Sequence, residues 1–517
     1  MSSRYGGKRV KKGLTHFVLG KVVSAICGFL AMILVIRLLP VQAFAHYSVL
    51  VSLIEIFTAV SALGLSHALV RYVPELYAKH YKIALKDFVL GAFLLRTTLL
   101  FGMLLVAYIW ATPVANFIGM ASFILAFKWY LWVVLLRTTL FFVSQILEST
   151  LHQGISQLAF SISAVTRLAG MLYLNAQNTN IHAHADLIAV IWVEILSDVL
   201  GLVVMLLGVF YVIWHGTGVA ANAVLESKRD ANWLQTNIRQ IRHFALTGYA
   251  QHIIGLPFGS NTNRLVGGYL FSNPVMASFG FAQSFYEYIK RYLPAQLLVG
   301  LIRPIVVARF SRKRDFAAAA STCEQISLIN MTIIGALFAL LIVGGKEAIA
   351  WISEGKYGFQ ALLVLLTLML VLALETHRLI LELLVQTVER YAILIPSNLV
   401  LALSVLPAML LFDQLGAVGF PLANALALLF CNAWVKHKLA VEGFFIIQNR
   451  RAMLQLSGAV ITTTLLGLAF KGLGMHWLMA SIIVQMVFFA WVLIMFGALF
   501  KKLVADLLGR EIDTLPI

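Results

Sequence analysis

Residues 187–214 read LIAVIWVEILSDVLGLVVMLLGVFYVIW, an apolar run whose polar members are Glu194, Ser197 and Asp198. A helix needs about 20 predominantly apolar residues to cross a hydrocarbon core about 30 Å thick. This run is longer than that requirement, and it contains no proline that would end a helix. It therefore predicts a membrane-spanning helix, and the same pattern recurs along the chain.

The composition of the whole chain agrees with this interpretation. Of 517 residues, 61% are hydrophobic and 12% are charged, whereas an average soluble domain carries about 25% charged residues. This composition excludes soluble enzymes, nucleic-acid binders and single-pass receptors. The sequence predicts an all-α polytopic membrane protein.

Apolar runs and the breaks between them predict fourteen transmembrane helices. Met1–Lys12 is basic, but the apolar run after it is longer than the 7–15 residues of a signal-peptide core, which indicates a first transmembrane helix. The predicted helices are 14–39, 44–70, 87–111, 123–147, 156–177, 187–214, 244–271, 277–303, 326–344, 359–382, 391–412, 418–441, 456–471 and 477–499.

Basic residues in the loops predict the orientation of the chain, because cytoplasmic loops accumulate Lys and Arg. The N-terminus, the loops after even-numbered helices and the C-terminus together carry 26 Lys and Arg residues, against four in the opposite set of loops. Both termini are therefore predicted to be cytoplasmic. The formal net charge of +17 follows from these loops and does not indicate nucleic acid as a partner.

The chain also shows signs of an internal repeat. AFAHYSVLVSL (43–53) and VMASFGFAQSF (275–285) open the second and eighth predicted helices, and each follows a break that contains proline. Repeats of this kind, with a binding site at their interface, are typical of secondary transporters. We predict two six-helix pseudo-repeats plus two C-terminal helices. The predicted parts are an N-terminal segment (1–13), an N-terminal lobe (14–214), a basic linker (215–243), a C-terminal lobe (244–441), two additional helices (442–499) and a tail (500–517).

The sequence contains no motif of an ATPase or a metalloenzyme. A phosphate-binding G-x-x-x-x-G-K-[ST] loop, an H-E-x-x-H motif and paired-cysteine spacing are all absent from the sequence. His182, His184 and Asp186 form an H-x-H-x-D pattern, which we interpret as an ordinary loop, and the three cysteines are far apart. We therefore predict neither a metal nor a cofactor, and a protein that is not an enzyme.

Ionisable residues inside the predicted spans are the strongest functional signal, since each costs about 2.5–3.5 kcal/mol at the membrane centre unless it has a partner or faces water. Arg96, Arg137, Arg167 and Arg264 have no acidic neighbour at i±3 or i±4. An arginine fork suits phosphate oxygens, so these residues predict a cationic cavity that binds an anionic substrate. The full predicted substrate-binding set is Arg96, Arg137, Arg167, Arg264, Lys290, Arg291 and Arg378.

For the last three residues of that set, pairing within one helix is an alternative. Glu287 stands three residues before Lys290 and four before Arg291, while Arg378 lies between Glu375 and Glu382 at the same spacings. Such pairs would let the helix insert without any role in transport.

Three carboxylates are candidates for ion coupling: Glu55, Glu194 and Asp198. Glu194 and Asp198 are four residues apart on one helix face, where two poorly solvated carboxylates do not both ionise cheaply. An acidic group held near neutrality could carry a proton across. The alternatives are that this pair provides counter-ions for Arg137 or Arg167, or lies in a wet cavity.

The seventh predicted helix is unusually polar, with Pro257, Gly259 and the run Ser260–Asn263 before Arg264. Such a stretch is tolerated at membrane depth where it lines a cavity or is buried in protein. It predicts a breakable, site-lining helix.

The opening unit resembles the first two helices of bacterial polysaccharide flippases, a family of the multidrug/oligosaccharidyl-lipid/polysaccharide exporter superfamily. The residues that carry the resemblance are Gly28-Phe29, Arg37-Leu38-Leu39, Tyr47-Ser48 and Gly64 to Arg71. Asn263-Arg264-Leu265 and Gly280-Phe281-Ala282 are similar to the start of that family's second half. In relatives an acidic residue often precedes this arginine. In this chain the preceding residue is Asn263, which is neutral.

The resemblance implies flipping of undecaprenyl-pyrophosphate-linked oligosaccharide or polysaccharide units across the bacterial inner membrane by alternating access. The implied partners are this lipid-linked glycan and the bilayer, with a glycan polymerase as a further candidate. Three alternatives remain: a peptidoglycan-precursor lipid flippase, a cation-coupled multidrug exporter, and a non-transporting scaffold of a glycan polymerase.

Overall fold

The computed structural model describes residues 7–78, 81–150, 152–181, 186–215, 223–296, 316–388, 390–446 and 450–508. Every regular element in these residues is a helix. Eleven helical segments in this part of the chain are long and apolar enough to cross a membrane. The predicted all-α polytopic fold is confirmed. The histidines of the H-x-H-x-D pattern, the chain before residue 7 and the tail after residue 508 lie outside the described residues.

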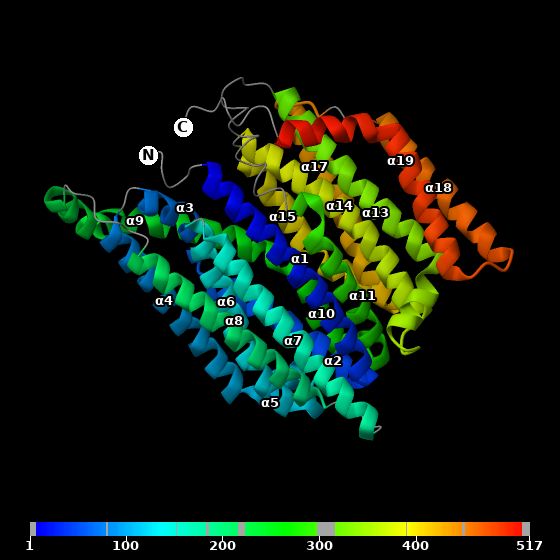
Figure 1. The fold of residues 1–517 in the computed structure, drawn as a ribbon, viewed down its shortest axis with the longest axis horizontal. Helices are drawn as coiled ribbons and strands as arrows, with labels where there is room; N and C mark the ends of the chain where they lie inside the picture. The colour runs from blue at the N-terminus through cyan, green and yellow to red at the C-terminus, as the bar shows by residue number, and fades with distance from the viewer. Residues whose placement is uncertain are drawn as a thin grey trace. The chain divides into compact units, whose positions relative to one another are not determined.

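The chain divides into two compact units, Met1–Gly280 and Phe281–Ile517. In Figure 1 the helices of each unit run side by side as a bundle. The helices of the first unit are α1 (Gly7–Leu38), α2 (Val41–Ser61), α3 (Leu65–Ala78), α4 (Lys82–Ile109), α5 (Ala111–Phe117), α6 (Ile124–Ser149), α7 (Gln153–Ile181), α8 (Leu187–His215), α9 (Ala223–Gly255) and α10 (Ser260–Leu270).

Helix α11 (Asn273–Tyr292) crosses the division between the units. The second unit continues with α13 (Phe316–Ile352), α14 (Phe359–Thr387), α15 (Leu394–Ala402), α16 (Val405–Leu415), α17 (Gly419–Val441), α18 (Arg450–Gly472) and α19 (Trp477–Leu508). Four short 3₁₀ helices connect these elements: η1 (Ala121–Phe123), η2 (Leu256–Phe258), η3 (Tyr391–Ile393) and η4 (Gly416–Val418).

Several predicted helices differ from the observed ones in their number or limits. The predicted helices 391–412 and 418–441 fall within one apolar segment, Leu394–Val441, which η4 and other short breaks divide. The predicted helices 244–271 and 277–303 are largely helical where described, with a break before Ser260 in the first of them, but they are not among the eleven apolar segments. Residues 297–303 lie outside the described part.

The predicted end of the second helix at residue 70 is wrong, because α2 ends at Ser61 and a separate helix, α3, begins at Leu65. Between them Leu63 has φ 44° and Gly64 has φ 73°, and this pair of left-handed residues interrupts the helix. A Cβ on Gly64 would overlap the carbonyl oxygen of Ala245 in α9. Glycine is therefore required here both by the backbone angle and by the close approach of α9.

The predicted linker 215–243 is partly helical in the structure. Its residues from Ala223 onward are helical and continue without a break into the predicted seventh span, forming α9. Helix α9 packs against α3 and α4, and α10 packs against α2. The first compact unit extends to Gly280.

Each unit has its own apolar core. In the first unit, α3, α4, α6 and α9 bury a cluster that includes Leu69, Val73, Leu85, Phe142 and Ile241. In the second unit, α13, α18 and α19 bury Ala336, Leu456 and Phe488, among others. Some charged side chains are buried as well. Among the predicted site residues these are Arg96, Glu194, Asp198, Arg264 and Arg378.

Candidate functional site

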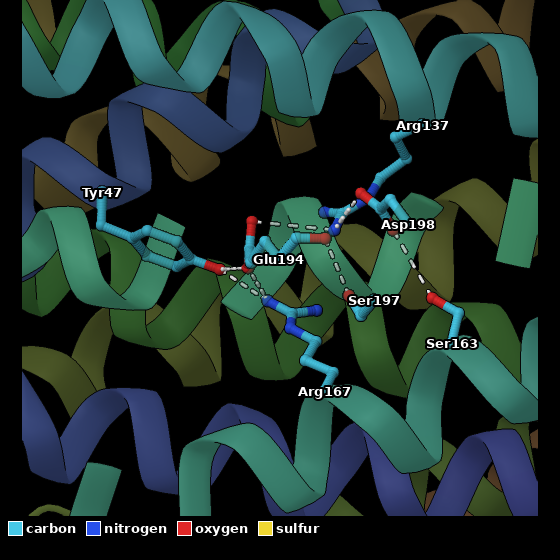
Figure 2. A network of polar contacts seen from close by, with 7 residues as sticks. All are labelled: Tyr47, Arg137, Ser163, Arg167, Glu194, Ser197 and Asp198. Atoms are coloured by element: carbon cyan, nitrogen blue, oxygen red, sulfur yellow. Dashed lines mark hydrogen bonds and ion pairs between the residues drawn. The ribbon is translucent and has the colours of Figure 1, made fainter. Parts of the chain in front are cut away.

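A buried network of charged side chains joins four helices of the first unit (Figure 2). Arg137 of α6 binds Asp198 of α8, with 2.8 Å between Nη2 and Oδ2 and 3.0 Å between Nε and the same oxygen. Arg167 of α7 forms an ion pair with Glu194 of α8. Tyr47 of α2 donates to Glu194 Oε1 at 2.5 Å and accepts from Arg167 Nη2 at 2.7 Å.

The network is charge-balanced, since two arginines face two carboxylates. Glu194 is fully buried and Asp198 is 3% exposed, and Ser163 donates to the second oxygen of Asp198 at 3.5 Å. Arg137 Nη2 also lies 3.7 Å from Glu194 Oε2, so it contacts both carboxylates. Glu194 and Asp198 are therefore counter-ions of Arg137 and Arg167 in this structure, which is one of the alternatives that the sequence left open.

Arg96 of α4 has a different environment. It is 3% exposed, its guanidinium carbon lies 4.4 Å from the centroid of the Phe142 ring, and Nη2 donates to the Thr58 carbonyl at 3.5 Å. Its Nε and Nη1 have no hydrogen-bond partner. Among the described residues, no carboxylate forms an ion pair with Arg96. It is a buried cation that the fold stabilises mainly through an aromatic ring.

The predicted break in the seventh helix is present in the structure. Helix α9 ends at Gly255, η2 contains Pro257, and α10 begins at Ser260. Asn261 Nδ2 donates to Glu55 Oε2 of α2, and Arg264 Nη1 donates to Asn261 Oδ1 at 3.4 Å. Arg264 is thus connected to Glu55 through the amide of Asn261, and it is 1% exposed.

Helix α2 contacts both of these regions. Tyr47, Glu55 and Thr58 of α2 meet Arg167, Asn261 and Arg96 respectively. The structure therefore places three polar contacts along one helix. It does not bring the four arginines to a single point.

In the second unit, Lys290 of α11 forms an ion pair with Glu375 of α14, with 2.7 Å between Nζ and Oε2. Tyr286 donates to the same carboxylate oxygen at 2.6 Å. The partner of Lys290 is therefore on another helix, whereas the spacing had suggested Glu287 of its own helix. Arg291, on the same turn of α11, is exposed.

Arg378 of α14 is paired as its spacing predicted. Its Nε donates to Glu382 Oε1 at 2.8 Å, and Nη2 donates to Asn398 Oδ1 of α15 at 2.7 Å. Nη1 is buried without a hydrogen-bond partner. One donor of this guanidinium is thus still available.

A cavity of about 420 Å³ lies in the second unit and was not predicted. Residues of α13, α14 and α18 line it, including Glu324, Gln325, Met331, His377, Leu381 and Met453. His377 lies next to Arg378 in the chain, so α14 carries both this arginine and a wall of the cavity. No sequence pattern marks such a cavity, because its walls come from three separate helices.

The described residues contain no group of three or more His, Cys, Asp or Glu side chains that could hold a metal ion. Cys323 and Cys431 are buried, and Cys27 is partly exposed.

The fold is similar to those of known flippases and transporters. Lipid II flippase MurJ in an inward closed conformation aligns with a TM-score of 0.66 and 11% identity, covering 94% of this chain and 99% of that chain. A multidrug resistance MATE family transporter of the MOP superfamily, in an inward-facing conformation, aligns with a TM-score of 0.59 and 11% identity, covering 82% and 98%.

The sequence matches no protein-family model. It also matches no curated protein. The chain therefore has the fold that MurJ and this MATE transporter share. The similarity is one of structure, because the sequence identity to each is 11%. Both similar proteins are membrane transporters or flippases by their names, and neither is named as an enzyme.

Proposed function

We propose that this chain is a flippase that moves undecaprenyl-pyrophosphate-linked oligosaccharide or polysaccharide units across the bacterial inner membrane by alternating access. The observation that supports a flippase is the similarity of fold to a lipid II flippase over 94% of the chain, while the choice of glycan follows from the resemblance of the opening helices. The buried basic residues and the resemblance of the opening helices to polysaccharide flippases support it.

The second unit offers both surfaces that an amphiphilic substrate would need. Lys290 and Arg378 provide cationic groups on α11 and α14, and the cavity beside α14 has mostly apolar walls. A lipid-linked pyrophosphate has an anionic head and a long hydrocarbon chain. We propose that the head binds basic groups and that apolar walls such as these accept the chain.

The proposed anion-binding set remains Arg96, Arg137, Arg167, Arg264, Lys290, Arg291 and Arg378. Within it, Arg96 and Arg291 form no ion pair with any described carboxylate, and Arg378 retains a donor without a partner. These three are the first candidates for contact with phosphate. Arg137, Arg167 and Lys290 would have to exchange a carboxylate partner for substrate.

A peptidoglycan-precursor flippase is the second candidate function, and the similarity to lipid II flippase MurJ favours it. A cation-coupled multidrug exporter is a further alternative, which the similarity of fold to a MATE transporter also supports, but such an exporter would favour acidic groups without partners. Glu194 and Asp198 are each bound to an arginine, which weighs against that role for them.

The test is translocation by the purified chain in vesicles. Fluorescent undecaprenyl-pyrophosphate-linked oligosaccharide is incorporated, and a membrane-impermeant reductant bleaches the outer leaflet. We expect the chain to make inner-leaflet substrate accessible to the reductant. Arg96→Ala should slow this step, while Arg71→Ala should not, because Arg71 is exposed and paired with Glu75.

The alternatives give different results in the same assay. Fluorescent lipid II would be moved preferentially by a peptidoglycan-precursor flippase. A scaffold would move neither lipid. If the purified chain moves neither lipid while MurJ under the same conditions moves lipid II, the proposed function is wrong.

A further inference from the structure

A tyrosine, a carboxylate and a cation are in mutual contact in the first unit. Tyr47 of α2 donates to Glu194 Oε1 at 2.5 Å, and the same oxygen forms an ion pair with Arg167 of α7. Arg167 Nη2 also donates to the Tyr47 hydroxyl at 2.7 Å. Figure 2 shows both groups meeting at this carboxylate. Glu194 Oε1 thus has two partners, one neutral and one charged.

The second unit repeats this arrangement with other helices. Tyr286 of α11 donates to Glu375 Oε2 of α14 at 2.6 Å, and Lys290 Nζ lies 2.7 Å from the same oxygen. Lys290 also donates to the Tyr286 hydroxyl at 3.5 Å. The two tyrosines are on α2 and α11, which contain the beginnings of the two similar stretches of sequence, 43–53 and 275–285. The arrangement therefore comes from corresponding helices of the predicted repeats.

The cation is the more exposed partner of each ion pair. The side chain of Arg167 is 23% exposed and that of Glu194 is 0% exposed, while Lys290 is 34% exposed and Glu375 15%. Both tyrosines are buried. Because Lys and Arg carry their charge at the end of a long flexible stem, the cation can turn toward an incoming anion. The carboxylate stays in the protein.

A buried carboxylate that loses its cation is costly unless another donor remains. A tyrosine hydroxyl is such a donor, and a hydrogen bond to an ionised acceptor is roughly twice as strong as a neutral one. Asp198 has no tyrosine. Among the described residues, its side-chain partners besides Arg137 are limited to Ser163, at 3.5 Å. Departure of Arg137 would therefore leave Asp198 with one long hydrogen bond.

We propose that Arg167 and Lys290 each bind a phosphate oxygen of the substrate, and that Tyr47 and Tyr286 hold the carboxylates that these cations leave. The inference rests on the proposed function and deepens it, because it selects two anion-binding groups from the basic residues. The tyrosines are positioning residues, since they contact the carboxylates and act on the substrate through them. The retained carboxylate competes with the substrate for its cation. This competition favours release, which a transport site requires as much as binding.

Binding of farnesyl pyrophosphate to the full chain in nanodiscs tests this inference, with farnesol as the uncharged control. The parent should bind the pyrophosphate more tightly than farnesol, and Lys290→Gln identifies the site of the second unit by its loss from the titration. Tyr286→Phe should weaken binding at that site by roughly three- to tenfold, the contribution of one hydrogen bond. Glu375→Gln should strengthen it, because no carboxylate then competes for Lys290.

The double variant separates this role from direct contact with the substrate. In the Glu375→Gln background, Tyr286→Phe should cause no further change, because the tyrosine acts through the carboxylate. An equal loss in both backgrounds would mean that Tyr286 contacts the pyrophosphate itself, and would overturn the positioning role. Glu375→Gln is also informative where a tyrosine variant does not fold, since binding no tighter than that of the parent would refute the competition.

Tyr47→Phe tests the first unit, with Tyr130→Phe as a matched control. Tyr130 is fully buried, its ring centroid lies 6.4 Å from that of Tyr47, and its hydroxyl has no hydrogen-bond partner among the described residues. Tyr47→Phe should weaken pyrophosphate binding and Tyr130→Phe should not. The inference is wrong if the pyrophosphate binds no more tightly than farnesol, or if Tyr47→Phe and Tyr286→Phe both keep the parent's affinity. A chain that shows these effects but moves no lipid-linked glycan would contradict the proposed function and leave this inference standing.

Discussion

Arg96 holds a guanidinium against the ring of Phe142, and its Nε and Nη1 have no hydrogen-bond partner. A charged side chain at the membrane centre costs about 2.5–3.5 kcal/mol. A cation–π contact returns about 0.5–2 kcal/mol of that cost. We therefore expect Arg96 to decrease the stability of the fold, which is the behaviour of a residue retained for function.

We predict that Arg96→Leu raises the thermal unfolding midpoint of the purified protein and slows lipid translocation. The substitution removes a buried charge and keeps an apolar side chain beside Phe142. Thermal unfolding in detergent and the vesicle assay measure the two effects. Arg71→Leu, at an exposed position, is the control and should change neither. A lower midpoint for Arg96→Leu would mean that the guanidinium is a structural anchor.

The network of Tyr47, Arg137, Arg167, Glu194 and Asp198 behaves differently, because its charges compensate one another. Removing one partner of a buried ion pair typically costs about 3–5 kcal/mol, since the other charge is left without a partner. We predict that Glu194→Gln destabilises the first unit by an amount in this range.

A double-mutant cycle measures the coupling in this network. Arg167→Met combined with Glu194→Gln should cost less than the sum of the two single changes, because no charge is then left unpaired. Equilibrium unfolding in mixed detergent gives each free energy. Additive effects would show that Arg167 and Glu194 contribute independently, contrary to their ion pair.

At the scale of the helices, the turn between α2 and α3 depends on Gly64. Its φ of 73° is unfavourable for any other residue, and a Cβ there would overlap the backbone of Ala245. Packing of α9 on α3 therefore depends on this one position. The sequence contains the glycine, but nothing in its pattern shows that α9 approaches it.

We predict that Gly64→Ala destabilises the protein by about 2 kcal/mol or more, through the left-handed backbone angle and the overlap with α9. Gly91 of α4 is a matched control, because a Cβ there meets no atom within 4 Å. Gly91→Ala should be neutral or stabilise α4 by up to about 1 kcal/mol. Denaturant unfolding of both variants checks the difference, and equal effects would contradict the packing argument.

At the scale of the whole chain, the orientation in the membrane follows from the loops. The loop between α13 and α14 contains Lys356, in the set with few basic residues, whereas the segment between α17 and α18 precedes Arg450 and Arg451. Positively charged loops are retained in the cytoplasm during insertion. We therefore expect both termini to lie on the cytoplasmic side.

We predict that a cysteine at Phe359 reacts with a membrane-impermeant maleimide added to intact cells, and that a cysteine at Phe445 does not. The two positions are similarly exposed, at 60% and 66%, so a difference in labelling reports the side of the membrane. Cys27, Cys323 and Cys431 are replaced by alanine first. Both positions should react after the cells are permeabilised, and the reverse labelling pattern in intact cells would overturn the orientation.

Much of the fold could be predicted from the sequence, because a membrane helix is a local property. About 20 consecutive apolar residues are sufficient to cross the bilayer, so runs such as 187–214 predict their helices without knowledge of their neighbours. The break at Pro257 and Gly259 was predictable for the same reason, since both residues act on their own backbone. The predictions failed at the ends of helices. Two predicted helices lie within the single segment Leu394–Val441, and α2 ends earlier than predicted.

The partners of the buried charges could not be predicted in this way. Spacing along one helix identifies pairs such as Arg378 and Glu382, and that pair is present. Arg137, Arg167 and Lys290 instead bind carboxylates on other helices. Such a contact depends on the depth and rotation of two packed helices, which the spacing of residues in one helix does not contain. The sequence alone therefore identified the buried basic residues as candidates. Which of them form ion pairs and which do not depends on how the helices pack.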